Sequence, residues 1–280
     1  MAMSKVWFIT GAGSGIGKGI AQAALRAGDR VVATGRNLEK VRNVYPDVAQ
    51  ENIAFVQLDV ANEAQAKAAV DEAMKRFGRI DVLVNNAGYS LLGNFVQMTT
   101  AEIQQQFATN FYGVVHLMHA ALPVMRRQHS GHIINISSVA GVVGLKHCAA
   151  YAATKFAVEG LSLSVATEVE KFGIKITVVE PGFFRTDLLD AHNVRWVSKV
   201  VEDYAPEGTA HDMWAKYHGT QPGDPAKLGD ALVKIAAMQS PPKLFVAGSD
   251  ALNVITPAIE ERLRETRANE MLSKSTAGSV

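Results

Sequence analysis

The stretch TGAGSGIGKG, residues 10–19, stands between the apolar run KVWFIT at 5–10 and a pattern of apolar residues typical of a helix at 15–27. Glycines at a strand-to-helix turn let the backbone approach a phosphate, and the helix directs free N–H groups and its positive dipole end toward it. The glycine spacing is TGxxxGxG, with Gly11, Gly15 and Gly17. Other nucleotide motifs fit less well, because GxGxxG needs glycine where Ile16 stands and a P-loop needs glycine where Ala12 stands. The turn therefore predicts a nucleotide site.

Further apolar runs of strand length follow at 30–35, 53–58, 80–85, 131–137, 174–180 and 243–248. Several are apolar almost throughout, as expected of parallel strands covered by helices on both faces. Helical patterns stand between them at 62–77, 101–129 and 151–171, and Pro123 predicts a kink or break inside the second of these. The alternation predicts an α/β fold, a doubly wound parallel sheet of about seven strands with helices on both faces.

Composition limits the class of protein. The chain has 280 residues, 48% of them hydrophobic, which suits one large domain over 1–280. Its 28 basic and 27 acidic residues leave a net charge of +1 without long charged blocks, so neither nucleic acid nor an anionic membrane is the expected partner. The first ten residues lack the apolar core of a signal peptide, and no apolar run reaches the roughly 18–20 residues that span a bilayer.

The single cysteine, Cys148, excludes an intrachain disulfide and suits a reducing compartment, so we expect an unprocessed, soluble, cytoplasmic protein. No pair of histidines has the spacing of a zinc motif, and we expect no metal site.

The second predicted strand ends in VVATGRN, which bears on the kind of dinucleotide. An acid at the end of this strand holds the ribose hydroxyls in NAD-binding proteins, whereas a nearby arginine accommodates the phosphate of NADP. Here the acid position is Gly35, and Arg36 follows it. A guanidinium can bind a phosphate through paired hydrogen bonds, which favours NADP. The alternative is a solvated Arg36 paired with Glu39 or another surface acid.

In the stretch YAATK, Tyr151 and Lys155 have the spacing i and i+4, which places both side chains on one face of a helix. A nearby cation could lower the pKa of a phenol from about 10 by roughly 1–3 units and bring it within range of proton exchange. The alternative is an ordinary lysine whose stem packs on the surface while its charge reaches water.

Six features occur in order along the chain: TGxxxGxG, NNAG at 85–88, a lone Asn110, ISS ending at Ser138, YxxxK from Tyr151, and PG at 181–182. Together they closely resemble the short-chain dehydrogenase/reductase family, in its compact single-domain branch, over about residues 4–250. The later chain looks more like the carbonyl-reductase and hydroxysteroid-dehydrogenase-like members. The resemblance implies a Rossmann-type fold and an NADP(H)-dependent oxidoreductase that interconverts a ketone or aldehyde and an alcohol.

The resemblance also implies roles for individual residues. Tyr151 would be the general acid and base, Lys155 would hold the nicotinamide ribose and lower the phenol pKa, and Ser138 would hydrogen-bond the substrate oxygen. Asn110 would hold a water that links Lys155 to a proton relay. Asp59 would contact the adenine amino group, although a plain loop-capping role is nearly as good an interpretation. The residues expected to bind the cofactor are Gly11, Ser14, Gly15, Ile16, Gly17, Arg36, Asp59, Val60, Asn86, Ala87, Gly88, Tyr151, Lys155, Pro181, Gly182 and Thr186.

Alternative functions remain open. One is a noncatalytic Rossmann sensor that binds a dinucleotide, although such a sensor has no use for a proton relay. Another is a sugar-nucleotide epimerase or dehydratase, although these usually carry TGxxGxxG spacing and a larger C-terminal domain. A third is an NAD-dependent alcohol dehydrogenase.

The segment 183–220 breaks the alternation of strands and helices and carries two of the three tryptophans of the chain. An insertion of this length is more often functional than idle, so we expect a lid. A medium-sized or bulky apolar carbonyl substrate is favoured by the large apolar side chains of this segment, which are Phe183, Phe184, Leu188, Leu189, Trp196, Met213 and Trp214. The alternatives are an anionic substrate held by Arg185, Arg195 or Lys199, and aromatic side chains that only cover the C-terminal helices. The helical segments 101–129 and 151–171 carry more small and apolar residues than one sheet face requires, which suggests a homodimer or homotetramer.

Overall fold

Seven parallel strands form the central sheet of the computed structural model, which describes residues 4–186, 194–197, 199, 201–207, 209–214, 217 and 219–278. Their order across the sheet is β3-β2-β1-β4-β6-β7-β9. The strands are β1 (Val6–Ile9), β2 (Arg30–Gly35), β3 (Ile53–Gln57), β4 (Val82–Asn85), β6 (Gly131–Ile136), β7 (Ile174–Pro181) and β9 (Leu244–Ala247). The predicted doubly wound parallel sheet is confirmed, and the strand order reverses between β1 and β4.

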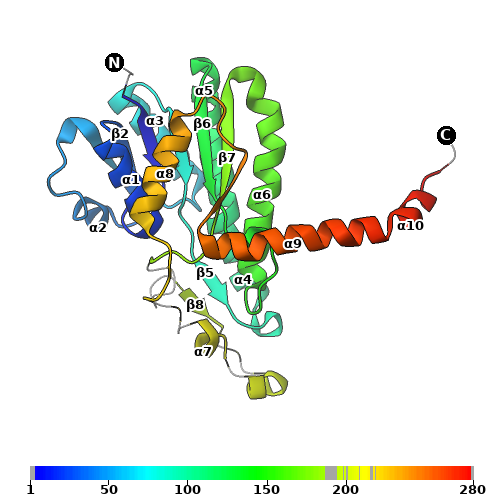
Figure 1. The fold of residues 1–280 in the computed structure, drawn as a ribbon. Helices are drawn as coiled ribbons and strands as arrows, with labels where there is room; N and C mark the ends of the chain where they lie inside the picture. Colours follow the sequence, from blue (N-terminus) through cyan, green and yellow to red (C-terminus); the bar gives the residue numbers. More distant parts are fainter. Residues whose placement is uncertain are drawn as a thin grey trace.

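Helices cover both faces of this sheet (Figure 1). One core lies between the sheet and the helices α1 (Gly15–Arg26), α2 (Leu38–Arg42) and α8 (Pro225–Ala237). The other lies between the sheet and the helices α3 (Glu63–Phe77), α5 (Gly113–Gln128) and α6 (Ala149–Val169). Successive residues of β1 enter opposite cores, with Trp7 and Ile9 in the first and Val6 and Phe8 in the second. Burial on both sides explains why these strands are apolar throughout.

Helix α8 lies closely against α1, because glycine is present on both sides of the contact. A Cβ atom at Gly19 would lie 2.3 Å from the carbonyl oxygen of Pro225, and one at Gly229 would lie 2.4 Å from the carbonyl oxygen of Gly19. Any larger residue would push the helices apart, and α1 carries the glycine-rich turn at its start. The contact therefore holds the nucleotide turn at its place on the sheet.

The predicted helix at 101–129 is divided differently from the prediction. It consists of α4 (Thr100–Phe107), a π-helical turn (Ala108–Tyr112) and α5, which continues through Pro123. Of the kink or break expected at Pro123, the break does not occur. A proline inside a helix costs about 3 kcal/mol, and the burial of Leu117 and Met125 on the same helix offsets that cost.

Beyond the carboxyl edge of the sheet, two separate segments, one after β4 and one after β7, form a small second layer of structure (Figure 1). Strands β5 (Ser90–Leu92) and β8 (Val194–Trp196) pair in parallel, and the short helix α7 (Ala210–Trp214) packs beside them. Their shared cluster contains Leu92, Cys148, Val194, Ala210 and Trp214. The predicted lid thus contributes a strand and a helix, neither of which the sequence pattern indicated.

The C-terminal helices α9 (Ser249–Ala268) and α10 (Glu270–Ser275) were also not predicted, and α9 projects away from the body of the molecule (Figure 1). Only Ala251 and Ile255 of α9 are buried. Short 3-10 helices occur at Gln50–Asn52, Phe95–Gln97, Val139–Gly141, Glu170–Phe172 and Glu202–Glu207. No helix within the described part of the chain has the length and apolar character needed to cross a membrane.

Candidate active site

A cleft of about 340 Å³ lies at the carboxyl edge of the sheet, beside the point where the strand order reverses. Open α/β sheets bind their ligands at this position. Of the predicted cofactor residues, all but Gly17 line the cleft, and of the predicted catalytic residues, all but Asn110 line it. Residues from both halves of the sheet thus meet in one cavity, which the sequence could only imply.

The glycine-rich turn takes a backbone conformation that requires glycine at two positions. Gly11 has a φ angle of 67° and Gly15 one of 52°, in the left-handed region that L-residues rarely adopt. Gly17 lies behind the turn, where a Cβ atom would come within 2.3 Å of the Gly11 carbonyl oxygen. Gly17 therefore shapes the turn and does not line the cleft, and its expected contact with a cofactor stays a prediction.

The end of β4 is tied to this turn through side chains. The Thr10 hydroxyl oxygen accepts hydrogen bonds from the backbone N–H groups of Asn86 at 2.8 Å and Ala87 at 2.9 Å. The Asn86 carboxamide donates to the Thr10 carbonyl at 2.9 Å and to the Gly11 carbonyl at 3.3 Å. These bonds explain why the TGxxxGxG and NNAG stretches occur together: each holds the other in place.

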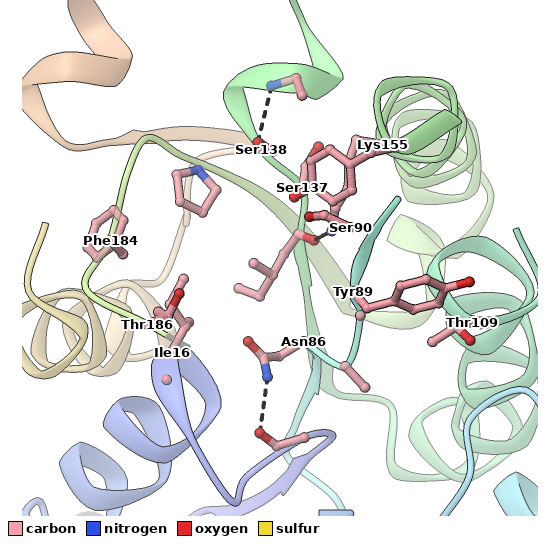
Figure 2. Close-up of a pocket in the computed structure, with 18 of the residues that line it drawn as sticks. Ile16, Asn86, Tyr89, Ser90, Thr109, Ser137, Ser138, Lys155, Phe184 and Thr186 are labelled. Carbon is pink, nitrogen blue, oxygen red and sulfur yellow. Dashed lines mark hydrogen bonds between the residues drawn. The ribbon is translucent and has the colours of Figure 1, made fainter. Parts of the chain in front are cut away.

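The start of α1 suits a pyrophosphate group. Ser14 occupies the N-cap position without a side-chain capping bond, and the first turn of α1 has no acidic residue. The first N–H groups of the helix and its positive dipole end therefore face the cleft without a competing anion. Ile16 and Thr186 lie side by side next to this turn, and a Cβ atom at Gly15 would lie 3.1 Å from the Thr186 side chain (Figure 2). A dinucleotide fits the residues present here.

Arg36 and Asp59 stand at the predicted adenosine end. Arg36 is exposed at the edge of the cleft, and within the described chain its guanidinium makes no ion pair, with Glu39 or any other acid. Asp59 accepts a hydrogen bond from the Ala61 backbone N–H at 3.1 Å and also lines the cleft, so the loop-capping interpretation of this residue is correct without excluding a contact with a ligand.

Helix α6 brings Tyr151 and Lys155 to the cleft, and the loop after β6 brings Ser138. The Lys155 ammonium lies 5.6 Å from the centre of the Tyr151 ring and donates a hydrogen bond to the Ile136 carbonyl at 2.7 Å. Ser138 caps the short helix that follows it by accepting from the Ala140 N–H at 3.1 Å (Figure 2). The side-chain pair at i and i+4 is therefore at the site, and Lys155 is only 6% exposed, which excludes the surface-lysine alternative.

The pKa values at this site differ from the expectation that Lys155 lowers the phenol pKa. Burial raises the pKa of Tyr151 to about 12, although a hydrogen bond with Ser138 acts in the opposite direction. Burial lowers the pKa of Lys155 to about 8, while the nearby Glu159 carboxylate raises it. At neutral pH the phenol is therefore protonated and Lys155 is mostly cationic, the forms that proton donation to a carbonyl oxygen requires.

Asn110 is buried in the π-helical turn and does not line the cleft. Its carboxamide pairs with the backbone of Tyr89, donating to the carbonyl at 2.9 Å and accepting from the N–H at 3.1 Å. A further contact reaches the Thr154 hydroxyl at 3.5 Å. The side chain thus joins the α4–α5 junction to Tyr89, the residue between NNAG and β5. Its role in holding a water molecule stays a prediction.

Glu159 is a buried acid that the sequence analysis missed, although it continues the spacing of Tyr151 and Lys155 by one more turn of α6. Its side chain is packed beneath the loop after β6, since a Cβ atom at Gly141 would meet both Ser137 and Glu159. Burial raises the pKa of Glu159 to about 7, the facing Ser137 hydroxyl lowers it, the Glu180 carboxyl raises it and Lys155 lowers it. At neutral pH this carboxyl is therefore only partly ionised.

Replacement of Glu159 by glutamine should stabilise the protein in a pH-dependent way. The native carboxyl has a pKa of about 7, above its ordinary value of 4.5, so its contribution to stability is present below about pH 4.5 and is lost as pH rises toward 7. Glutamine cannot ionise, so we expect Glu159→Gln to raise Tm by roughly 2–4 °C at about pH 8, equivalent to about 1 kcal/mol, and to leave it unchanged near pH 4.5. Thermal melting across this range measures the effect. The exposed Glu168→Gln, on the same helix, is the control, and an equal gain in both variants would contradict the assignment.

The predicted lid is partly in contact with the cleft. Phe183, Phe184 and Trp214 line it, whereas Trp196 and Met213 pack in the adjoining cluster without reaching it. Residues 187–193, 198, 200, 208, 215, 216 and 218 of the predicted lid lie outside the described residues. Among the residues that the structure does describe, no cluster of histidine, cysteine and acidic side chains could hold a metal ion.

A doubly wound parallel sheet with a glycine turn for a pyrophosphate, and with Tyr151, Lys155 and Ser138 at its carboxyl edge, defines a class of nucleotide-binding α/β oxidoreductases. Residues 5–195 match the family model for short chain dehydrogenase. The chain therefore belongs to the short-chain dehydrogenase/reductase family.

Two curated relatives are similar over most of their length. The oxidoreductase BOA17 of Botryotinia fuckeliana is 39% identical over 259 residues, which cover 92% of this chain and 94% of that protein. The 3-ketodihydrosphingosine reductase of Bacteroides thetaiotaomicron is 39% identical over 241 residues, which cover 85% of this chain and 86% of that protein.

Solved structures agree with the fold. A short-chain dehydrogenase from Streptomyces avermitilis has a TM-score of 0.88 at 35% identity, covering 99% of this chain and 100% of that one. ElxO with NADP bound has a TM-score of 0.75 at 31% identity, covering 90% and 100% of the two chains. A short-chain dehydrogenase/reductase from Burkholderia phymatum in complex with NAD shares the fold at 24% identity, with a TM-score of 0.79 and coverage of 99% and 98%.

Proposed function

We propose that this protein is an NADP(H)-dependent oxidoreductase that interconverts a ketone or aldehyde and an alcohol. The observation that carries the proposal is the meeting of Tyr151, Ser138 and Lys155 with the phosphate-binding turn in the wall of one cleft. A noncatalytic dinucleotide sensor would need the turn but not the buried acid–base group. The relative named as a 3-ketodihydrosphingosine reductase supports a carbonyl group as the reacting centre.

In this proposal the chain supplies binding, polarisation and proton transfer. The dinucleotide supplies the hydride when it is bound. The start of α1 binds the pyrophosphate, and Lys155 binds the nicotinamide ribose. Ser138 donates a hydrogen bond to the carbonyl oxygen, Tyr151 gives that oxygen a proton, and the Lys155 cation stabilises the phenolate that remains. Tyr151 acts as the base in the reverse direction.

Arg36 supports NADP as the dinucleotide, because its guanidinium forms no ion pair with a described residue and follows Gly35, where an acid would repel the 2′-phosphate. The NADP bound to ElxO supports the same choice. At the opposite end of the cleft, Leu92, Leu145, Cys148, Phe183 and Trp214 form an apolar wall. Burial raises the pKa of the Cys148 thiol to about 12, so this group is neutral. The wall suits a medium-sized or bulky apolar carbonyl compound beneath a lid at about 183–220.

A panel of ketones and aldehydes, each incubated with the protein and NADPH, tests the proposed reaction. We expect loss of nicotinamide absorbance with at least one bulky apolar carbonyl compound, and formation of the corresponding alcohol. Tight binding of NADPH with no turnover across the panel would favour the sensor interpretation. Faster turnover with NADH than with NADPH would contradict the choice of cofactor.

Replacement of Arg36 by alanine should weaken the binding of NADPH far more than the binding of NADH. Loss of a charge-assisted hydrogen bond costs roughly 1.5–3 kcal/mol, which is about 10–150-fold in Kd. Titration of both cofactors by nicotinamide fluorescence measures the difference, and the nearby exposed Lys40→Ala, outside the cleft, is the matched control. Equal weakening of both cofactors would show that Arg36 does not contact the 2′-phosphate.

The family membership also supports a homodimer or homotetramer. A surface groove lies between α5 and α6, the helices predicted to contact a second copy of the chain. Among the residues that line it are Met118, Leu122, Leu161, Val165 and Phe172. The single free cysteine remains the argument for a cytoplasmic location.

A further inference from the structure

Arg195, in the middle of strand β8, brings a cation from the predicted lid to the wall of the cleft. The other two cations considered for an anionic substrate do not line the cleft: Arg185 faces the Asp224 carboxylate at 4.0 Å, and Lys199 is exposed beyond β8. The Arg195 guanidinium forms no ion pair with an acid in the part of the chain that the structure describes. Its charge is therefore not neutralised by direct contact with one of these acids.

The other charged side chains of the cleft have places in the proposed cofactor site. Among the described residues that line the cleft, the charged ones are Arg36, Asp59, Lys155 and Arg195. In the proposed function Arg36 binds the 2′-phosphate, Lys155 binds the nicotinamide ribose, and Asp59 stands at the adenosine end. Arg195 is thus a cation in the cleft wall to which the proposed cofactor assigns no partner.

The Arg195 side chain is held in place by its neighbours. Its guanidinium carbon lies 4.9 Å from the centre of the Tyr89 ring, which also lines the cleft, and one of its N–H groups donates to the Gln105 side-chain oxygen. The Tyr89 carbonyl in turn accepts hydrogen bonds from the buried side chains of Gln106 at 2.7 Å and Asn110 at 2.9 Å. A guanidinium that is positioned before a ligand binds loses less side-chain entropy on binding.

Strand β8 belongs to the part of the molecule that borders the reacting centre. Trp196, next to Arg195, pairs with Leu92 of β5. Leu92 packs in one cluster with Cys148, which is the N-cap residue of α6, the helix that carries Tyr151. Leu92, Cys148 and Tyr151 all line the same cleft as Arg195. A molecule that reacts at Tyr151 therefore has an apolar wall and a cation in the same cavity.

The chemistry of Arg195 selects an anion with two oxygen atoms. A guanidinium has five N–H donors and binds a carboxylate or a phosphate through two parallel hydrogen bonds. Phosphate monoesters carry up to two charges, whereas one guanidinium neutralises one. Hydrogen bonds from Thr99, and after them the charge of Arg195, lower the pKa of Glu102, but Thr99 already binds that carboxylate at 2.8 Å. A carboxylate on the ligand matches the single charge of Arg195.

We propose that Arg195 determines specificity by binding a carboxylate of the substrate, which is therefore an oxo acid. An apolar body that lies against Leu92, Phe183 and Trp214 separates the reacting carbonyl from the carboxylate. The identity of the reacting group rests on the proposed function. The carboxylate subsite is testable without it, because recognition of the anion requires binding alone.

Three oxo acids test the subsite without turnover. They are para-acetylbenzoate and two straight-chain acids, one medium and one long, with a methyl ketone at the far end. Each is paired with its primary amide, which has a similar shape and no charge. Calorimetry measures their binding to the protein saturated with oxidised NADP or NAD, whichever binds more tightly, because this form has no hydride to give a ketone. We expect at least one acid to bind about tenfold or more tightly than its amide.

Variants then assign the preference to Arg195. Arg195→Gln and Arg195→Met both remove the charge and keep part of the stem, and this exposed position tolerates either residue. Each should reduce the preference for the acid to about threefold or less, with nearly unchanged affinity for the amide and for NADPH. Arg185→Gln is the matched control, because Arg185 belongs to the same segment and does not line the cleft. It should retain the full preference.

The outcomes separate the subsite from the proposed reaction. Equal affinity for acid and amide in every pair, binding of none of the probes, or a preference that survives both Arg195 variants would overturn the subsite. A loss of NADPH affinity as large as the loss of preference would assign Arg195 to the cofactor and also overturn it. Turnover with NADPH is measured separately: a preference for the acid without turnover supports the subsite and contradicts the proposed reaction, whereas turnover without preference does the reverse.

Discussion

Replacement of Tyr151 by phenylalanine should lower kcat for carbonyl reduction at least about a hundredfold and leave the affinity for NADPH nearly unchanged. Phenylalanine keeps the ring that lies 5.6 Å from the Lys155 ammonium but has no proton to give. Burial raises the phenol pKa to about 12, so Tyr151 of the wild type carries its proton across the physiological pH range. A change of pH cannot supply this proton in the phenylalanine variant.

Single-turnover reduction and fluorescence titration of NADPH measure the two quantities separately. Tyr112→Phe is the control, because Tyr112 is exposed and lies outside the cleft. Ordinary turnover in Tyr151→Phe would remove this residue from the mechanism. A loss of cofactor affinity as large as the loss of rate would indicate a collapsed site rather than a missing acid.

Lys155→Ala should lower kcat about tenfold or more and also weaken cofactor binding by about tenfold, because this residue is expected to have two roles. Its ammonium is buried, held by the Ile136 carbonyl at 2.7 Å, and placed where it can stabilise a Tyr151 phenolate as well as bind a ribose hydroxyl. The two effects should appear together as a lower kcat and a higher Kd for NADPH.

Lys171→Ala provides the comparison, since Lys171 is an exposed lysine in the turn directly after α6. A loss of rate with unchanged cofactor affinity would remove the ribose contact from the proposal. An unchanged rate with weaker cofactor binding would instead show that Lys155 does not assist Tyr151. Melting temperatures of both variants are needed, because removal of a buried charge can itself stabilise the fold.

Most of the site could be predicted because its signals are local in the chain. Gly11 and Gly15 require glycine for their own backbone angles, and Tyr151 and Lys155 share a helix face by spacing alone. Glu159 follows the same spacing and could have been found in this way. The places of Gly17 and Asn110 outside the cleft could not be predicted, because they depend on contacts with distant parts of the chain, the Asn86 side chain and the Tyr89 backbone.

The apolar strand runs, the alternation with helices and the ordered motifs were sufficient by themselves to determine the doubly wound sheet, the family and about half of the residues that line the cleft. Backbone conformation and face pattern are properties of neighbouring residues, so a sequence displays them directly. The tertiary structure alone decided the raised pKa of Tyr151 and the burial of the Glu159 carboxyl. Both depend on desolvation, which arises only when segments far apart in the chain pack together and exclude water.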